Sequence, residues 1–363
     1  MEHALTHLLQ SIPTLDAAAL DAAKKRQAML AKPPGSLGKL EDISIRLAGI
    51  TGQVQNTLER RRIIVLCADN GIAAEGVASA PQSVTASQAV NMTRHLTGMS
   101  ALAAAFGDDV QVVDMGMVCP YDAPAILNRR IAAGTRNLAK EPAMTREEAL
   151  RAILTGAELA KGAKAEGFDV IGVGEMGIGN TTTSAAVLSA LTGAAVETVT
   201  GRGGGINDES FLRKKALIRQ ALELHRPDPA DPVDVLSKVG GFDLAAMCGV
   251  FLGAAACRLP VVIDGFISIV AALCAARLAP AAAEYFFPSH ASYEQGYALA
   301  ARELGLEPWL LLDMRLGEGS GCPLAFQIMR AACAAMNGMA TFAGAGINDE
   351  YLNEIREKES FQV

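Results

Sequence analysis

The residues best placed for acid–base chemistry lie near the end of the chain, where LLDMRLGEGSGCP (311–323) surrounds Glu318 with three glycines. Glycines let a loop bend tightly and let a ligand approach the backbone. The apolar residues 309–312 predict a buried strand before this loop, and Pro323 favours a helix start after it. A carboxylate at the carboxyl end of a strand lies where ligands bind in open α/β sheets. Glu318 is therefore a candidate active-site acid, with a solvated surface turn as the alternative.

Acidic residues recur at or just after the ends of the predicted strands. They are Asp69, Asp114, Glu175, Asp264 and Glu318. In a parallel sheet these positions share one edge. A cluster of acids is costly unless a cationic ligand or hydrogen-bond donors balance it. The pattern therefore indicates a functional site at that edge.

GVGEMG (172–177) matches the dinucleotide fingerprint G-x-G-x-x-G. It follows a predicted strand, precedes a predicted helix, and has Glu197 about twenty residues further on, as that fingerprint requires. Glu175 lies inside the motif, however, and would repel a pyrophosphate. The same glycines suit another ligand, with Asn180 and Thr181 as donors at the helix start. Dinucleotide binding stays open as the second interpretation.

GRGGG (201–205) offers successive backbone N–H groups that can form an anion nest, including those of Gly203 and Gly204. Lys214 and Lys215 lie in the next predicted helix. A phosphate group can be held by such a nest together with one ammonium group. The alternative is a flexible loop beside a solvated helix face.

The histidines predict no metal site, because no H-E-x-x-H motif occurs. His290, within PSHAS (288–292), is interpreted as a hydrogen-bonded structural residue. No G-x-S-x-G motif occurs either, which argues against an α/β hydrolase. We expect neither a metal nor an organic cofactor.

The elements that must position these residues alternate between strands and helices. Short apolar runs predict strands, and helical spacing predicts helices at 85–106, at 182–191 and, after a capping box in TREE, at 145–164. The predicted strands are 62–68, 109–115, 168–173, 195–200, 260–263, 284–287 and 309–312. This order predicts an α/β fold, a doubly wound and mostly parallel sheet with helices on both faces.

The chain ends predict a second, smaller helical domain. Apolar residues at helical spacing cover 15–30 and 37–47, with a break at PPGS and Ser36 as a plausible N-cap. A polar helix is expected at 348–358. We therefore expect residues 1–60 and 343–363 to form the small domain and residues 61–342 the large catalytic domain.

Composition excludes several classes of protein. The chain has 363 residues, of which 50% are hydrophobic and 20% charged, so it is not disordered. The net charge of −7 and the lack of a recurring basic patch argue against nucleic acid as a partner. We find no apolar stretch long enough to span a bilayer, so no membrane partner is expected.

The seven cysteines point to a cytoplasmic protein. Their number is odd and no C-x-x-C occurs, so neither a disulfide framework nor a zinc site fits. The first residues, MEHALTHLLQ, lack the basic region and cleavage site of a signal peptide.

Several long motifs, in order along most of the chain, resemble those of one enzyme family. RLGEGSG at 315–321 closely resembles the catalytic loop of nicotinate-nucleotide–dimethylbenzimidazole phosphoribosyltransferases, which act in cobalamin lower-ligand assembly. Further matches are KPPGSLG (32–38), GVGEMGIGNTT (172–182), LSKVGGFDL (236–244), DGF (264–266) and PSHxS (288–292).

The resemblance implies that nicotinate mononucleotide and 5,6-dimethylbenzimidazole are converted to α-ribazole 5′-phosphate and nicotinate. It also implies a homodimer with a doubly wound large domain. Glu318 is expected to be the general base and Glu175 to lie in the active site, while Gln88 holds the benzimidazole and Lys214 the phosphate. The other expected substrate contacts are Ala80, Gly177, Asn180, Thr181, Gly203, Gly204, Asp264, Ser292, Arg315, Leu316 and Gly321.

One position departs from the family pattern. The family often has a serine where this chain has Ala80, just before Pro81. A donor to the base is then lost, which affects the expected specificity for the base.

The residue types suit this chemistry without a metal. The pyridinium group leaves as a neutral ring, and one carboxylate can take the azole proton, typically contributing about 10²–10⁴-fold. Acids such as Glu175 can stabilise positive charge growing on the ribose. Attack from the opposite face would invert C1′ from β to α. Two alternatives remain, an NAD-dependent oxidoreductase and a non-catalytic nucleotide-binding sensor.

Overall fold

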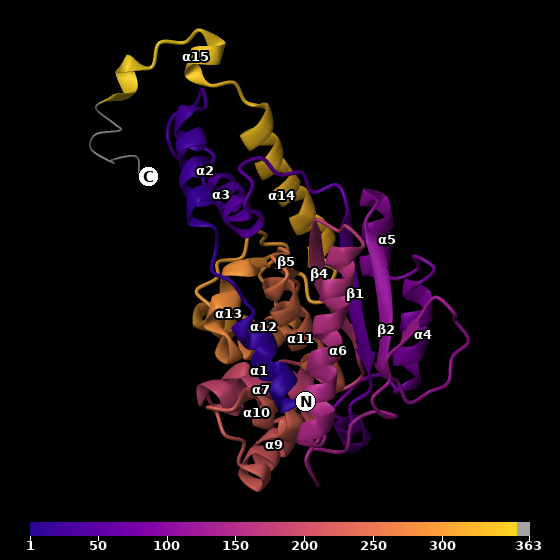
Figure 1. Cartoon of the computed structure of the whole chain (residues 1–363). Coiled ribbons are helices and arrows are strands. Elements are labelled where there is room, and N and C mark those ends of the chain that lie inside the picture. The colour runs from indigo at the N-terminus through magenta and orange to yellow at the C-terminus, as the bar shows by residue number, and fades with distance from the viewer. Residues whose placement is uncertain (354–363) are drawn as a thin grey trace. The chain divides into compact units, whose positions relative to one another are not determined.

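The computed structural model describes residues 1–353, and its centre is a six-stranded sheet in which all neighbouring strands are parallel (Figure 1). The strand order is β3-β2-β1-β4-β5-β6. The bounds are β1 Arg61–Ala68, β2 Asp109–Gly116, β3 Leu127–Asn128, β4 Val170–Met176, β5 Val261–Ile263 and β6 Phe286–Pro288. The predicted mostly parallel α/β fold is confirmed.

Both faces of the central strands are covered, because every residue of β1 is buried. Helices α4, α5, α11 and α12 contact the sheet, and α6 packs on α11. The longer helices of this unit are α1 Glu2–Gln10, α4 Ser83–Met92, α5 Gly98–Phe106, α6 Arg146–Ala165, α7 Asn180–Thr192, α9 Asp208–His225, α10 Pro232–Val239, α11 Phe242–Ala256 and α12 Phe266–Leu278. The shorter ones are η1 Gly71–Glu75, α8 Val196–Val199, η2 Pro280–Tyr285 and α13 Tyr297–Glu303.

The register of the sheet brings acidic residues to one edge. Cys67 near the end of β1 pairs with Asp114 of β2, and its neighbour Leu66 pairs with Glu175 of β4. Asp69 and Asp264 directly follow β1 and β5. The expected acidic edge therefore exists for these four residues.

The chain divides into two compact units, at different residues from those expected. The larger unit contains residues 1–13 and 60–325, and the smaller one residues 14–59 and 326–363. The N-terminal helix α1 thus belongs to the larger unit. Residues 326–342, within and just after α14 (Gly321–Gly338), belong to the smaller one.

The smaller unit is helical in its described part. Helices α2 (Ala17–Met29) and α3 (Lys39–Thr51) pack through Ala19, Ala23 and Ala48 against Met336 of α14. Arg26 donates from Nε to the backbone oxygen of Met336 at 2.8 Å. Alanines at the contact allow close packing of the helices. The unit ends with α15 (Phe342–Ala345) and η3 (Glu350–Leu352), and residues 354–358 of the expected terminal helix lie outside the described residues.

Two predicted strands are wrong. Residues 195–200 contain a helical turn, α8 (Val196–Val199), because a spacing of three residues lets Val196 and Val199 both be buried on one helix face. In the run 309–312 Leu310 forms only an isolated β-bridge, with His290 outside the named strands, and Leu311 is 82% exposed. Short apolar runs alone do not separate strands from exposed turns.

Two helix boundaries also differ from prediction. The expected helix 85–106 is two helices, since Thr97 forms a capping box with Ser100 that starts α5 anew. The N-cap of α3 is Gly38 with a φ of 51°, rather than Ser36. The capping box predicted at Thr145 is confirmed as the start of α6.

Glycines bring α6 and α11 into main-chain contact. A Cβ on Gly156 would lie 1.9 Å from the carbonyl oxygen of Ala246, and one on Gly249 would lie 1.8 Å from that of Ile153. Real Cβ atoms do not approach so closely, so this seam requires glycine. Within the described part of the chain, no helix is both long and apolar enough to cross a membrane.

Candidate active site

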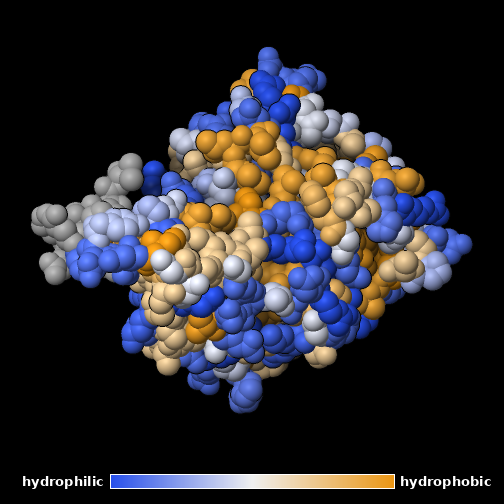
Figure 2. Space-filling view, turned by 90° about the horizontal axis from the view of Figure 1, so that it is seen from above, coloured by the Kyte–Doolittle hydropathy of each residue, from blue (hydrophilic) through white to orange (hydrophobic). Residues whose placement is uncertain are grey.

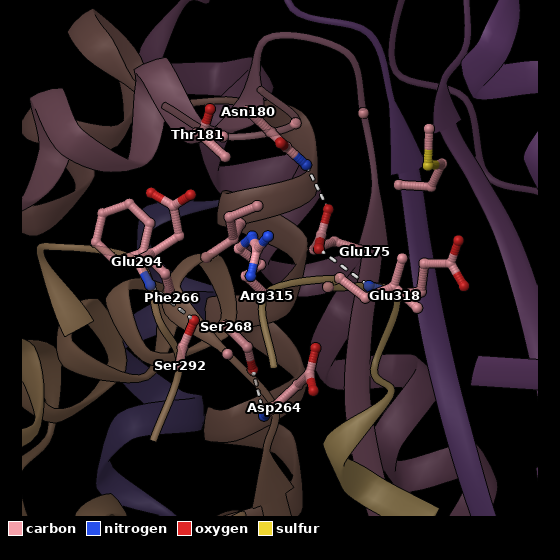
Figure 3. Close-up of a pocket in the computed structure, with 18 of the residues that line it drawn as sticks. Glu175, Asn180, Thr181, Asp264, Phe266, Ser268, Ser292, Glu294, Arg315 and Glu318 are labelled. Carbon is pink, nitrogen blue, oxygen red and sulfur yellow. Dashed lines mark hydrogen bonds between the residues drawn. The ribbon is translucent and has the colours of Figure 1, made fainter. Parts of the chain in front are cut away.

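A cavity of about 250 Å³ opens where β4 and β5 end (Figure 3). Three buried carboxyl groups line it, those of Glu175, Asp264 and Glu318. Glu175 is the last residue but one of β4, Asp264 follows β5, and Glu318 lies in the loop before α14. Two strand ends and one glycine loop therefore deliver the three acids to one place.

Hydrogen bonds fix two of these carboxyl groups. Glu175 accepts from the side-chain amide of Asn180 through Oε2 and from the backbone N–H of Glu318 through Oε1 at 3.3 Å. Asp264 accepts from the backbone N–H groups of Gly319 and Gly321 at 3.0 and 2.7 Å. The same acids that line the cavity thus hold the loop that carries Glu318.

Burial makes these acids hard to ionise. It raises the pKa of Glu175 to about 8, and the charges of Asp243 and Asp264 add to this rise. It raises the pKa of Asp264 to about 7, against the opposing effect of the Gly321 and Gly319 N–H groups. Burial likewise raises the pKa of Asp243, behind the cavity, to about 7. A ligand that brings positive charge would favour their ionised forms.

Glu318 has a strained backbone, and its side chain accepts a hydrogen bond from the main chain. Its φ is 64°, in the left-handed region that disfavours non-glycine residues, between Gly317 at 81° and Gly319 at 91°. Its Oε2 accepts from the backbone N–H of Met99 at 3.2 Å, in the first turn of α5. In Figure 3 its carboxyl group points away from that of Glu175.

The G-x-G-x-x-G glycines serve protein packing. A Cβ on Gly174 would lie 2.3 Å from the carbonyl oxygen of Glu318, and one on Gly177 would lie 2.1 Å from that of Ala68. Residues 172–176 belong to β4 itself, so the first glycines do not form a loop around a phosphate. The dinucleotide interpretation loses its structural basis.

Other lining residues of the cavity are suited to an anion. They are Gly203, Gly204 and Thr181. Lys214 lies behind them with no exposed surface, and its Nζ donates to Thr181 Oγ1 at 2.8 Å and to the Gly201 carbonyl at 3.0 Å. Burial lowers the pKa of Lys214 to about 8, and Glu294 opposes this shift.

Lys215 lies elsewhere. Its Nζ is 3.9 Å from the centre of the Phe211 ring, in a cation–π contact. Lys214 therefore lies behind the cavity wall, bonded to its lining residue Thr181, without itself lining the cavity, and Lys215 lies further away.

Most of the other predicted substrate contacts also gather here. The cavity is lined by Gln88, Gly177, Asn180, Ser292, Arg315 and Leu316. Ala80 and Gly321 are not among the lining residues. Gly321 contacts the cavity only indirectly, because its N–H donates to the lining residue Asp264. Next to Ala80, the hydroxyl of Ser79 donates to the Gly204 carbonyl at 3.4 Å.

Two acids of the strand edge lie outside the cavity. Asp69 accepts from Thr85 Oγ1 at 2.6 Å and from the Val118 N–H at 2.8 Å. Asp114 accepts from the Met117 N–H at 2.8 Å. These bonds organise the loops after β1 and β2, so only part of the acidic edge belongs to the candidate site.

His290 matches its structural interpretation. It is buried, its Nδ1 lies 3.2 Å from Ser289 Oγ, and burial lowers its pKa to about 4. Among residues 1–353, no group of three or more histidine, cysteine, aspartate or glutamate side chains is placed to hold a metal ion.

Sequence reasoning missed several lining residues, of which Glu294 is the most prominent. Ile267 and Ser268 also line the cavity, just after the DGF motif. Glu294 comes two residues after PSHxS, and only that proximity could have drawn attention to it.

Comparison with known proteins gives one consistent family. A family model described as phosphoribosyltransferase matches residues 12–347. A relative from Clostridium perfringens, strain ATCC 13124, is 52% identical over 99% of both chains. A second, from Clostridium tetani, is 47% identical over 98% of both. Both relatives are nicotinate-nucleotide–dimethylbenzimidazole phosphoribosyltransferases.

Solved structures are similar as well. The crystal structure of CobT from Thermus thermophilus is 41% identical, with a TM-score of 0.87 over 92% of this chain and 99% of that one. A second structure from the same organism, of nicotinate-nucleotide–dimethylbenzimidazole phosphoribosyltransferase, has a TM-score of 0.86 at 40% identity over the same shares of each chain.

Proposed function

Because this chain belongs to the phosphoribosyltransferase family that its full-length relatives define, we propose that it moves the phosphoribosyl group of nicotinate mononucleotide to 5,6-dimethylbenzimidazole. The products are α-ribazole 5′-phosphate and nicotinate, in the assembly of the cobalamin nucleotide loop. The observation that carries the proposal is one cavity lined both by three buried acids and by Gly203 and Gly204, with Lys214 buried behind its wall.

Glu318 is the general base in this proposal. The attacking benzimidazole nitrogen bonds to C1′ while the N–H on its other nitrogen gives up a proton, and one carboxylate can accept that proton. The bond from C1′ to the pyridinium nitrogen breaks, and its electron pair leaves with nicotinate. Glu318 turns from the Met99 N–H toward the base for this step.

Glu175 and Asp264 act on the sugar. Positive charge grows on the ribose as the old bond weakens, and two buried acids beside it become easier to ionise. Gln88 lies on the cavity wall and is positioned to bind the base. Attack from the face opposite to the departing ring inverts C1′ from β to α.

The phosphate is proposed to bind at the glycine end. The N–H groups of Gly203 and Gly204, the Thr181 hydroxyl and the Lys214 ammonium are the available donors. An ammonium has three N–H donors, and Thr181 and the Gly201 carbonyl use two of them. The proposal assigns the third to the phosphate.

The test is to incubate the protein with nicotinate mononucleotide and dimethylbenzimidazole in the presence of EDTA. We expect equal amounts of α-ribazole 5′-phosphate and nicotinate by chromatography. Binding of the nucleotide without release of nicotinate would instead identify a non-catalytic sensor. An absorbance change of NAD with candidate substrates would favour an oxidoreductase.

We further propose that the protein is a cytoplasmic homodimer. Its seven cysteines are all free thiols. Large apolar side chains near the cavity are exposed, with Tyr293 at 68%, Leu311 at 82% and Leu312 at 52%, and the surface in Figure 2 mixes apolar with polar side chains. Sedimentation equilibrium should give twice the chain mass of 37.8 kDa, and a single-chain mass at micromolar concentration would contradict the dimer.

A further inference from the structure

The Glu294 carboxyl group lies where a phosphate is expected to bind. A Cβ on Gly201 would lie 1.8 Å from Glu294 Oε2, so the carboxyl group rests directly on the first glycine of the nest. Glu294 lines the cavity beside Gly203 and Gly204, and Figure 3 shows its carboxyl group on the Thr181 side. A carboxylate at this place repels a phosphate dianion if both stay there.

The groups that face Glu294 are the donors assigned to the phosphate. Burial raises the pKa of Glu294, while Lys214, the Gly203 N–H and Arg315 act to lower it. Glu294 in turn opposes the fall in the pKa of the buried Lys214. The charge of Glu294 thus acts on an ammonium group that has no exposed surface, although no ion pair within 4 Å joins Glu294 and Lys214 among the described residues.

The side chain of Glu294 has a second place to go. A neighbouring cavity of about 880 Å³ shares Gly203, Gly204, Arg315 and Leu316 with the first, and Glu294 lines both. Its main chain is anchored, since its N–H donates to Ser292 Oγ at 3.4 Å and its carbonyl accepts from the Tyr297 N–H at 3.1 Å. Rotation of the side chain alone can therefore carry the carboxyl group between cavities.

We propose that Glu294 occupies the anion site of the free protein as a stand-in for phosphate, and that the nucleotide phosphate displaces it into the neighbouring cavity. The charge that acts on Lys214 is then that of the phosphate in place of that of Glu294. This inference rests on the proposed phosphate position. Glu294 then competes with every anion for this site, and anions that bind weakly are excluded most.

The inference predicts a gain in affinity on removing the charge. A competitor that leaves the site open in about a tenth of the molecules raises the apparent dissociation constant about tenfold. Glu294→Gln should therefore lower the inhibition constant of inorganic phosphate and the KM for nicotinate mononucleotide by up to about tenfold. The KM for dimethylbenzimidazole should change less. Glu294→Ala should act in the same direction, because the charge is what matters.

The matched control is Glu209→Gln. Glu209 makes an exposed ion pair with Arg213 in α9, the helix that carries Lys214, and its removal changes the net charge equally. Urea denaturation of each variant checks that it is folded. Phosphate affinity that rises in both variants would reflect general electrostatics and overturn the inference.

Other outcomes separate this inference from the proposed function. If the wild type turns over and Glu294→Gln has an unchanged KM for the nucleotide, the stand-in role is overturned while the proposed reaction stands. A raised nucleotide KM also overturns it, and points to a bond between Glu294 and the ribose hydroxyls. Absence of product from the wild type, with phosphate binding that still tightens in Glu294→Gln, overturns the proposed reaction and keeps the anion site.

Discussion

At the scale of the single residue, Glu318 makes one hydrogen bond through its backbone and another through its side chain. Its backbone N–H donates to Glu175, and its side chain accepts from the Met99 N–H. The first bond fixes the loop, so the side chain can leave the second without moving the main chain. The strained φ of 64° is the cost of aiming both groups from one position.

Replacing Glu318 with glutamine should separate folding from chemistry. The amide oxygen can still accept from Met99, so the melting temperature should stay close to that of the wild type. The amide cannot take the azole proton, so kcat should fall at least about 100-fold. Steady-state assays with both substrates measure this, and near-normal turnover would remove Glu318 as the base.

Lys214→Met should act mainly on nucleotide binding. Methionine fills a similar volume without a charge, so the buried site keeps its packing while the phosphate loses its ammonium partner. We expect the KM for nicotinate mononucleotide to rise at least about tenfold, the value of one charge-assisted hydrogen bond. The KM for the base should change little.

Lys215→Met is the neighbouring control, since Lys215 contacts Phe211 outside the cavity. Equal increases of both KM values in the Lys214 variant would count against its phosphate role.

At the scale of elements, β4 and the Glu318 loop are packed main chain to main chain. Gly174→Ala would place a methyl group 2.3 Å from the Glu318 carbonyl oxygen. The loop must then shift, so we expect most turnover to be lost and the midpoint of urea denaturation to fall.

Gly162→Ala tests the same substitution where nothing lies within 4 Å, in the interior of α6. It should raise stability by about 0.5–1 kcal/mol with activity retained. Equal behaviour of the two variants would show that the contact at Gly174 has no consequence.

The sequence predicted best the elements with long, unambiguous signals. The apolar run of β1 and the capping box of α6 lie within a residue or two of their predicted bounds. The strand predicted at 195–200 was wrong because Val196 and Val199, three residues apart, are buried together on one face of a helical turn. The break between α4 and α5 was missed because apolar spacing continues across it.

The site was predictable only as far as motifs reached. Glu318, Asp264 and the segment 172–182 were predicted from strand ends and glycine patterns. Glu294 belongs to no such pattern. A carboxylate is also not expected beside a phosphate, because the two charges repel each other. Its position depends on a tertiary contact with Gly201 that no local spacing reveals.

At the scale of the whole molecule, the buried acids should make stability fall as pH rises. The pKa of Glu175 is raised from 4.5 to about 8, so the native state binds more protons than the unfolded state between these values. The free energy of unfolding therefore decreases with pH across that window, by at most about 1.4 kcal/mol per pH unit for one proton. Asp264 and Asp243 act in the same direction up to about pH 7.

Urea denaturation at pH 5, 6.5 and 8 measures this slope. Glu175→Gln should flatten it, because glutamine binds no proton in either state. A slope of the same steepness in the variant, or stability that rises with pH in the wild type, would contradict the raised pKa.

The glycine seam between α6 and α11 bears on how the protein can move during turnover. The carbonyl oxygens of each helix lie against the α-carbons of the other, so the two helices pack rigidly together. Helix α11 also contacts β1, β2 and β4 of the sheet. Because the loop 317–319 is itself held by Glu175 and Asp264, we expect any movement during substrate entry at residues 201–205. Selection for faster release would then act on residues 201–205, while the contact between α6 and α11 tolerates almost no change of side-chain size.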